Sequence, residues 1–204
     1  MPNTGLCYVI SLTYVCRMSE ENHMNPSPLG IDALMEKLHE LKGEAYWKQL
    51  KAITERKEFK PVEKGIYSAA GTEGPDYPNL LDAAKKAVAQ GYQAFILPNP
   101  KAFRSADLIL ERKGFYRMYD VKTISGKTSI DNRLLDSIGQ SDRVLLLLTT
   151  DVNPRLFGAN IKKYFEINPV AKEVLIFKNK ETISITRQET AKKTFIRDFW
   201  KNLL

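Results

Sequence analysis

Residues 105–123 read SADLILERKGFYRMYDVKT, and this stretch decides the fold that we expect. Apolar residues dominate 106–110 and recur through 116–123, while residues 112–114 between them are polar and end in glycine. Two such runs joined by a short turn are typical of a β-hairpin. The aromatic residues Phe115, Tyr116 and Tyr119 are expected to pack within this hairpin.

A carboxylate and an ammonium group are expected side by side on the second strand of the hairpin. Side chains alternate between the faces of a strand, so Asp120 and Lys122 share one face and Val121 points to the core. Burying such charges on a central strand is costly without a purpose. The short turn brings Asp107 alongside, so that two carboxylates and a lysine converge.

This group of side chains suits the cleavage of phosphodiester bonds. Two carboxylates bind a hard divalent cation through oxygen, with Mg²⁺ the first choice and Mn²⁺ or Zn²⁺ as alternatives. Such an ion supplies positive charge at the phosphate, and a lysine can position water or neutralise developing charge. Asp107 and Asp120 are therefore predicted metal ligands, and both are predicted to act with Lys122 in catalysis.

Mixed secondary structure surrounds the hairpin. We expect helices over 80–90, 130–140, 155–167 and 188–203, and strands over 94–97, 144–148, 174–177 and 182–185. The run 144–148 is continuously apolar, which suits a strand buried on both faces. The pattern predicts an α/β (or α+β) domain over 79–204, with a mixed central sheet flanked by helices.

Residues 1–78 are expected to form an N-terminal extension. Apolar residues over 31–58 recur at helical spacing with a break near Gly43, so the extension is predicted to be largely helical from about residue 31. Residues 60–78 are rich in proline and glycine and indicate a loop and a domain boundary. The apolar stretch 6–15 has no basic residue before it and makes a poor signal peptide.

Composition narrows the chemistry. The 204 residues carry a net charge of +7, which favours a polyanionic partner such as nucleic acid. Cys7 and Cys16 are the two cysteines, too few for four zinc ligands. The two histidines, His23 and His39, lie in the first 40 residues, so a site in the C-terminal half must use other side chains. No segment reaches the roughly 18 apolar residues of a transmembrane helix, so no membrane partner is expected.

The hairpin, helix and strand order, with Asp107 and the triplet 120–122, resembles the PD-(D/E)XK nuclease superfamily of restriction enzymes and many toxins. Ala106 stands where that motif usually has proline. The closer resemblance is to the C-terminal nuclease domains of contact-dependent growth inhibition toxins and related polymorphic toxins. In those domains an acid-x-lysine strand precedes a Ser/Thr-rich turn, and a helix ends in Lys/Arg-Gln-Ser/Ala before an aliphatic strand. Here residues 120–126 read DVKTISG and residues 138–146 read IGQSDRVLL.

The resemblance covers about residues 80–187 and not residues 1–75. It implies a restriction-endonuclease-like fold, a divalent metal, and tRNA or DNA as the substrate. It also implies delivery into a target cell, action in the cytoplasm, and a cognate immunity protein. Such domains tend to carry an acid in a helix before the core, and Asp82 matches loosely where glutamate is usual, as a third metal ligand and catalytic residue.

Further residues are expected around this site. The amide of Gln140 is a candidate to orient water or phosphate. Arg104, Lys127 and Arg133 are candidates for contacts with the phosphate backbone, within a basic surface that also takes in Lys101 and Arg143.

Two other functions fit the sequence. One is a metal-independent RNase of the barnase-like and colicin-like group, which the lack of histidine in the C-terminal half disfavours. The other is a catalytically inactive nucleic-acid-binding or structural protein of a phage or mobile element. Loss of activity on addition of EDTA would separate the metal-dependent nuclease from both.

Overall fold

The computed structural model describes residues 30–69, 74–98, 104–126, 130–178 and 181–203. A single eight-stranded sheet runs through them, and its strands lie side by side in the order in which they occur along the chain. The strands are β1 Phe59–Glu63, β2 Ile66–Ala69, β3 Gln93–Ile96, β4 Leu108–Arg112, β5 Phe115–Ile124, β6 Arg143–Leu148, β7 Glu173–Lys178 and β8 Glu181–Thr186. The helices are α1 Ile31–Lys37, α2 Gly43–Thr54, α3 Tyr77–Ala89, α4 Ile130–Asp136, α5 Pro154–Ile167, α6 Arg187–Thr190 and α7 Phe195–Leu203.

The sheet is mixed, which confirms the predicted α/β class. β2–β3, β5–β6 and β6–β7 pair in parallel, whereas the remaining neighbours pair in antiparallel. Each parallel pair is joined by a helical crossover: α3, α4 and α5 in turn. The β4–β5 hairpin that the sequence predicted forms the antiparallel centre of the sheet.

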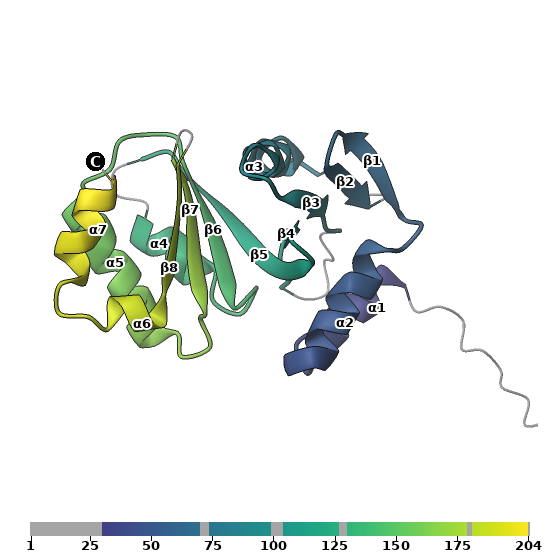
Figure 1. The fold of residues 1–204 in the computed structure, drawn as a ribbon, viewed down its shortest axis with the longest axis horizontal. Helices are drawn as coiled ribbons and strands as arrows, with labels where there is room; N and C mark the ends of the chain where they lie inside the picture. The colour runs from purple at the N-terminus through teal and green to yellow at the C-terminus, as the bar shows by residue number, and fades with distance from the viewer. Residues whose placement is uncertain (1–29, 70–73, 99–103, 127–129, 179–180, 204) are drawn as a thin grey trace, which may run out of the picture.

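Three helical groups cover the sheet (Figure 1). α1 and α2 pack on one face of its first half, over Ile109 and Met118. α3 packs on the opposite face, against Tyr119 and Val121. α4, α5 and α7 cover the second half of the sheet, over a core that includes Ile124. The strand β5 is therefore packed on both of its faces and runs between the two halves.

Residues 60–69, expected within a loop, lie almost entirely in β1 and β2, so that expectation is wrong for this segment. Gly65 adopts a left-handed φ of 77° in the tight turn between the two strands, a conformation open to glycine. Pro61 is tolerated because β1 is an edge strand, where a missing N–H costs no ladder bond. β2 pairs with β3, so the sheet crosses the domain boundary that we expected at residue 78.

Most of the other predicted elements are confirmed within a few residues. The helical pattern over 31–58 divides into α1 and α2, and α2 begins at Gly43, where the break was expected. The final helix is in fact two: α6 ends at Thr190 and α7 begins at Phe195. No helix in the described part of the chain is long and apolar enough to cross a membrane.

Candidate active site

Asp107 lies one residue before β4, at the point where β4 stops pairing with β5. Leu108 pairs with Tyr119, and the N–H of Asp107 donates to the carbonyl of the same Tyr119 at 2.9 Å, which keeps Asp107 beside Asp120. The carboxylate of Asp107 accepts a hydrogen bond of 2.7 Å from the backbone N–H of Val121. Its side chain thus takes the place of the ladder bond that β4 would have supplied next.

Asp120 and Lys122 lie on one face of β5, as the period of two requires. Lys122 Nζ lies 2.8 Å from Asp120 Oδ1, and the side chains are 14% and 0% exposed. On the other side, β5 pairs with the apolar strand β6, where Asp120 meets Val144 and Lys122 meets Leu146. A carboxylate is therefore held in the centre of the sheet with one charged partner.

The second carboxylate oxygen of Asp120 has no such partner. Oδ2 is buried and makes no hydrogen bond within the described part of the chain. Leaving a buried carboxylate oxygen unsatisfied costs on the order of 1–3 kcal/mol or more. A site of this kind is suited to a ligand that compensates the charge.

Electrostatics at the pair of carboxylates disfavour two negative charges. Burial raises the pKa of Asp120 to about 7, the charge of Lys122 lowers it, and the charge of Asp107 raises it. Burial also raises the pKa of Asp107, against the hydrogen bond from Val121 and the charge of Lys122. A cation bound between the two carboxylates would offset this repulsion.

The residues present fit a hard divalent cation. The unpartnered oxygen of Asp120 and the neighbouring carboxylate of Asp107 are oxygen ligands of the kind that such ions prefer. Among the described residues, however, no group of three or more His, Cys, Asp or Glu side chains is placed to hold a metal. The expected set of three carboxylates, with Asp82, is therefore not gathered.

Asp82 lies instead on the exposed side of α3. Its Oδ2 is 2.8 Å from Lys86 Nζ, one helical turn along. Asp76, the residue before α3, acts on the site: after burial, its charge is a further contribution that raises the pKa of Asp107. We did not predict Asp76, although an acidic residue just before a helix start is a recognisable signal.

Gln140 and Arg104 both attach to the end of α4. Gln140 Nε2 donates to the carbonyl of Asp136 at 2.7 Å, and Arg104 donates to the carbonyl of Ile138 at 3.2 Å. Both side chains therefore have a local structural use. Arg133 lies on the exposed side of α4. Lys101 and Lys127 lie outside the described residues.

Arg143 does not belong to an open basic surface, contrary to the prediction. Its side chain is 16% exposed, bonded to Asp142 at 2.7 Å and placed 3.5 Å from Glu173. The carboxylate partners come from the adjacent residue and from β7, and the second is distant in the chain. Its charge is therefore largely compensated within the fold.

Glu173 is a second buried carboxylate, and it differs from Asp120 in being fully bonded. Its oxygens accept from Tyr119 Oη at 2.9 Å and Ser184 Oγ at 2.6 Å, and Arg117 lies 3.3 Å away. Glu173 thereby ties β5, β7 and β8 together. Both oxygens of Glu173 are thus hydrogen-bonded, whereas one oxygen of Asp120 has no partner among the described residues.

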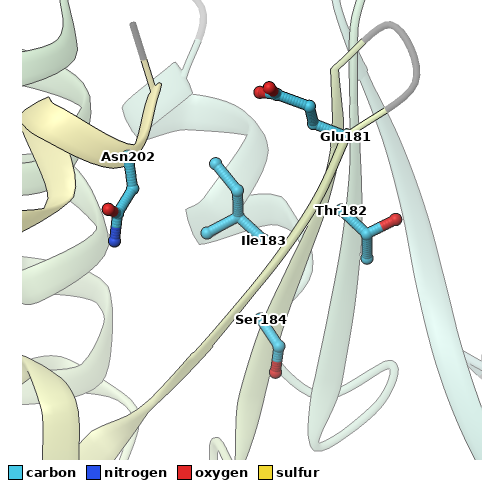
Figure 2. A pocket seen from close by; sticks show the side chains of 5 residues that line it. All are labelled: Glu181, Thr182, Ile183, Ser184 and Asn202. Atoms are coloured by element: carbon cyan, nitrogen blue, oxygen red, sulfur yellow. The ribbon is translucent and has the colours of Figure 1, made fainter.

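A hollow of about 430 Å³ lies along β8, away from the carboxylate pair (Figure 2). It is lined by Glu181, Thr182, Ile183, Ser184 and Asn202. In Figure 2, Ile183 points toward α7 and Thr182 points to the other side of the strand. β6 and β7 separate this hollow from β5, so it takes no part in the chemistry of Asp120.

No protein-family model matches the chain, and no curated protein matches it. A solved structure that is similar is the CdiA-CT/CdiI toxin and immunity complex from Burkholderia pseudomallei. The match has a TM-score of 0.42 and 15% sequence identity, and it covers 59% of this chain and 98% of the other. At this degree of similarity the match carries no argument about function, which has to come from the side chains of this chain.

Proposed function

We propose that this chain is a metal-dependent nuclease of the PD-(D/E)XK type that hydrolyses phosphodiester bonds in tRNA or DNA. The observation that supports this proposal best is the buried Oδ2 of Asp120, which has no hydrogen-bond partner among the described residues. Asp107, one residue before β4, adds its negative charge beside it, and Lys122 is bound to the other oxygen of Asp120 at 2.8 Å. Two acids and a lysine at the centre of a sheet are a costly arrangement for a merely structural strand.

Each residue has a separate role in the proposed reaction. Asp107 and Asp120 hold the cation, Mg²⁺ first and Mn²⁺ or Zn²⁺ as alternatives, and the bound ion supplies positive charge at the phosphate. Lys122 cannot be a ligand while protonated, because an ammonium group has no lone pair. Its ammonium group instead neutralises the charge that develops on the phosphate or holds the attacking water.

The toxin character of the proposed nuclease rests on the sequence motifs of residues 120–126 and 138–146. We extend the proposal to delivery into a target cell, action in the cytoplasm and neutralisation by a cognate immunity protein. Growth arrest on expression in the cytoplasm, relieved by the Lys122→Ala substitution, is the expected behaviour. Equal growth of cells with the wild-type and variant chains would contradict the toxin character.

The test is a cleavage assay on plasmid DNA and on total tRNA, with Mg²⁺ and with EDTA. Wild type is expected to cleave in Mg²⁺ alone, and Asp120→Asn and Lys122→Ala are expected to lose activity. The exposed ion pair of Asp131 and Lys163, also 2.8 Å long, offers matched controls in Asp131→Asn and Lys163→Ala. Cleavage that survives EDTA, or an Asp120→Asn variant as fast as wild type, would reject the proposal.

A second candidate is a nucleic-acid-binding protein without catalytic activity. It is favoured by the engagement of Asp107 with Val121 N–H and because, among the described residues, no three acids are placed together to hold a metal. This candidate predicts binding of nucleic acid without cleavage in any divalent metal. The same assay, combined with a binding measurement, separates the two.

A further inference from the structure

Two aromatic side chains lie exposed against each other at the turn end of the β4–β5 hairpin. Trp47 of α2 is 40% exposed and Phe115 of β5 is 53% exposed. Their rings meet edge to face, with centroids 5.0 Å apart. We expected Phe115 to pack within the hairpin, as the buried Tyr119 does, whereas the structure leaves it about half exposed.

Cationic residues flank Phe115 in the hairpin. Arg112 is its partner across the hairpin, and Arg117 follows two residues along β5. Lys113 lies exposed in the turn between the strands. Arg112 also lies over the ring of Tyr92, 5.2 Å from its centroid.

The acidic side chains of this region are bonded within the protein. Glu111 accepts a hydrogen bond of 2.6 Å from the N–H of Gly114 and thereby closes the turn. Glu173, the partner of Arg117, is 7% exposed, whereas Arg117 is 45% exposed. The end of the hairpin therefore presents aromatic rings and positive charge to solvent.

We propose that this aromatic–cationic hairpin end, formed by Trp47, Phe115, Arg112 and Lys113, binds unpaired bases of nucleic acid. The inference rests on the proposed nuclease function and narrows its substrate to nucleic acid with a single-stranded segment. An exposed aromatic ring stacks on any base, and neighbouring Arg and Lys side chains contact the phosphates on either side. Duplex bases are stacked on each other and leave no face for these rings.

The charge of the surface favours nucleic acid over a protein partner. A protein would have to bring carboxylates to Arg112 and Lys113 as well as an apolar group to the rings. A nucleic-acid strand carries a flat base and a phosphate in every nucleotide, so one ligand meets both requirements. Phe115 and Asp120 lie on the same strand, five residues or roughly 17 Å apart.

Trp47 itself reports on this surface. The chain has two tryptophans, and the other, Trp200, lies on α7 beside Arg155. A Trp200→Phe chain therefore has Trp47 as its one tryptophan. We expect oligo(dT), added in EDTA so that no metal-dependent cleavage occurs, to quench the emission of Trp47. The oligo(dT) concentration at which half of the quenching is reached should increase as the salt concentration rises.

Substitutions at Phe115 test the stacking. Phe115→Ala is expected to weaken oligo(dT) binding by about tenfold or more, in the range of base–aromatic stacking. Phe115→Leu keeps an apolar side chain without a π face and should weaken binding to a similar degree. Leu156→Ala removes a side chain of similar exposure, 51%, from α5 and is the matched control that should bind as wild type. Thermal melting of each variant by circular dichroism identifies any loss of folding.

Three results would overturn the inference. One is an unchanged Trp47 emission while oligo(dT) saturates the protein by another measurement. Another is Phe115→Leu binding as tightly as wild type, which would leave no role for stacking. The third is self-association of the chain that Phe115→Ala abolishes, which would assign the surface to a protein contact. If oligo(dT) quenches the Trp47 emission but the chain cleaves no substrate, the nuclease function is rejected and the binding surface is kept. If the chain cleaves nucleic acid but the Trp47 emission does not change, the binding surface is rejected and the nuclease function is kept.

Discussion

The carboxylate of Asp107 accepts a hydrogen bond of 2.7 Å from the backbone N–H of Val121, the residue after Asp120. Asp107 therefore has a structural role in the sheet, besides the metal-binding role that we propose. Asp107→Ala leaves that N–H without its acceptor and is expected to lose on the order of 1–3 kcal/mol of stability. Asp107→Asn keeps a carbonyl oxygen in place and should lose much less.

Both Asp107 variants should nevertheless lose cleavage, because neither supplies a negative charge to a cation. Urea unfolding of each variant, set beside its cleavage rate, separates the two roles. Equal stability of Asp107→Ala and wild type would show that the hydrogen bond contributes little. Full activity in Asp107→Asn would show that the charge of Asp107 is not needed.

Lys122→Ala is expected to lower the cleavage rate by on the order of 10²–10³, the usual effect of removing a group that stabilises charge in the transition state. Calorimetric binding of Mg²⁺ or Mn²⁺ should be kept, because Lys122 is not a ligand. Cleavage at the wild-type rate would leave Lys122 as the structural partner of Asp120 alone.

The Lys122→Ala substitution should also lower the stability of the folded protein. Lys122 compensates a fully buried carboxylate, so its removal is expected to cost stability. Since the charge of Lys122 lowers the pKa of Asp120, removing it should raise that pKa further. The loss of stability is therefore expected to be larger at about pH 8 than at about pH 6.

The metal-free protein should become less stable as pH rises from about 4 to about 7. The pKa of Asp120 rises from 3.8 to about 7 on folding, so in this window the folded state binds a proton that the unfolded state has released. Asp120→Asn removes this titration and should flatten the dependence. A divalent cation should add more stability above this window than within it, because protons compete for the same carboxylate. Thermal melting across this range, with EDTA and with Mg²⁺, measures both effects, and a rising stability in EDTA would contradict the first.

Binding of nucleic acid should weaken as salt rises, because each phosphate contact releases counterions. Arg133 is exposed on α4. Arg133→Ala is therefore expected to reduce the slope of log affinity against log salt concentration by the share of about one phosphate contact. Arg143 is paired within the fold and serves as the contrasting position: its loss should lower stability rather than the salt slope. Salt-independent binding, or no binding at low salt, would count against a nucleic-acid partner.

A chain that begins at residue 79 is expected not to fold. β2 pairs with β3, and α1 and α2 bury Phe95, Ile109 and Met118 on one face of the sheet. Removing these elements would expose that face and an unpaired strand edge to solvent. A cooperative thermal transition in the shortened chain would show instead that residues 79–204 form an independent domain, as the loop-rich pattern of 60–78 suggested.

Local sequence patterns predicted the central strands of the sheet more successfully than the strand at its edge. Alternation over 116–123 predicted β5, and the apolar run 144–148 predicted β6. β1 escaped detection because four of its five residues are exposed, so no alternation marks it. β1 becomes a strand by pairing with β2. β2 in turn pairs with β3, which follows it in the chain after helix α3.

The amino-acid sequence by itself determined the hairpin and the common face of Asp120 and Lys122, because both follow from the spacing of residues along one strand. Only the tertiary structure decided which charges are compensated. It buries Glu173 among hydroxyl and guanidinium groups and pairs Arg143 with Asp142 and Glu173, yet among the described residues it leaves Asp120 Oδ2 without a hydrogen-bond partner. Compensation depends on which side chains the fold brings within hydrogen-bonding distance, and many of those partners lie dozens of residues away in the chain.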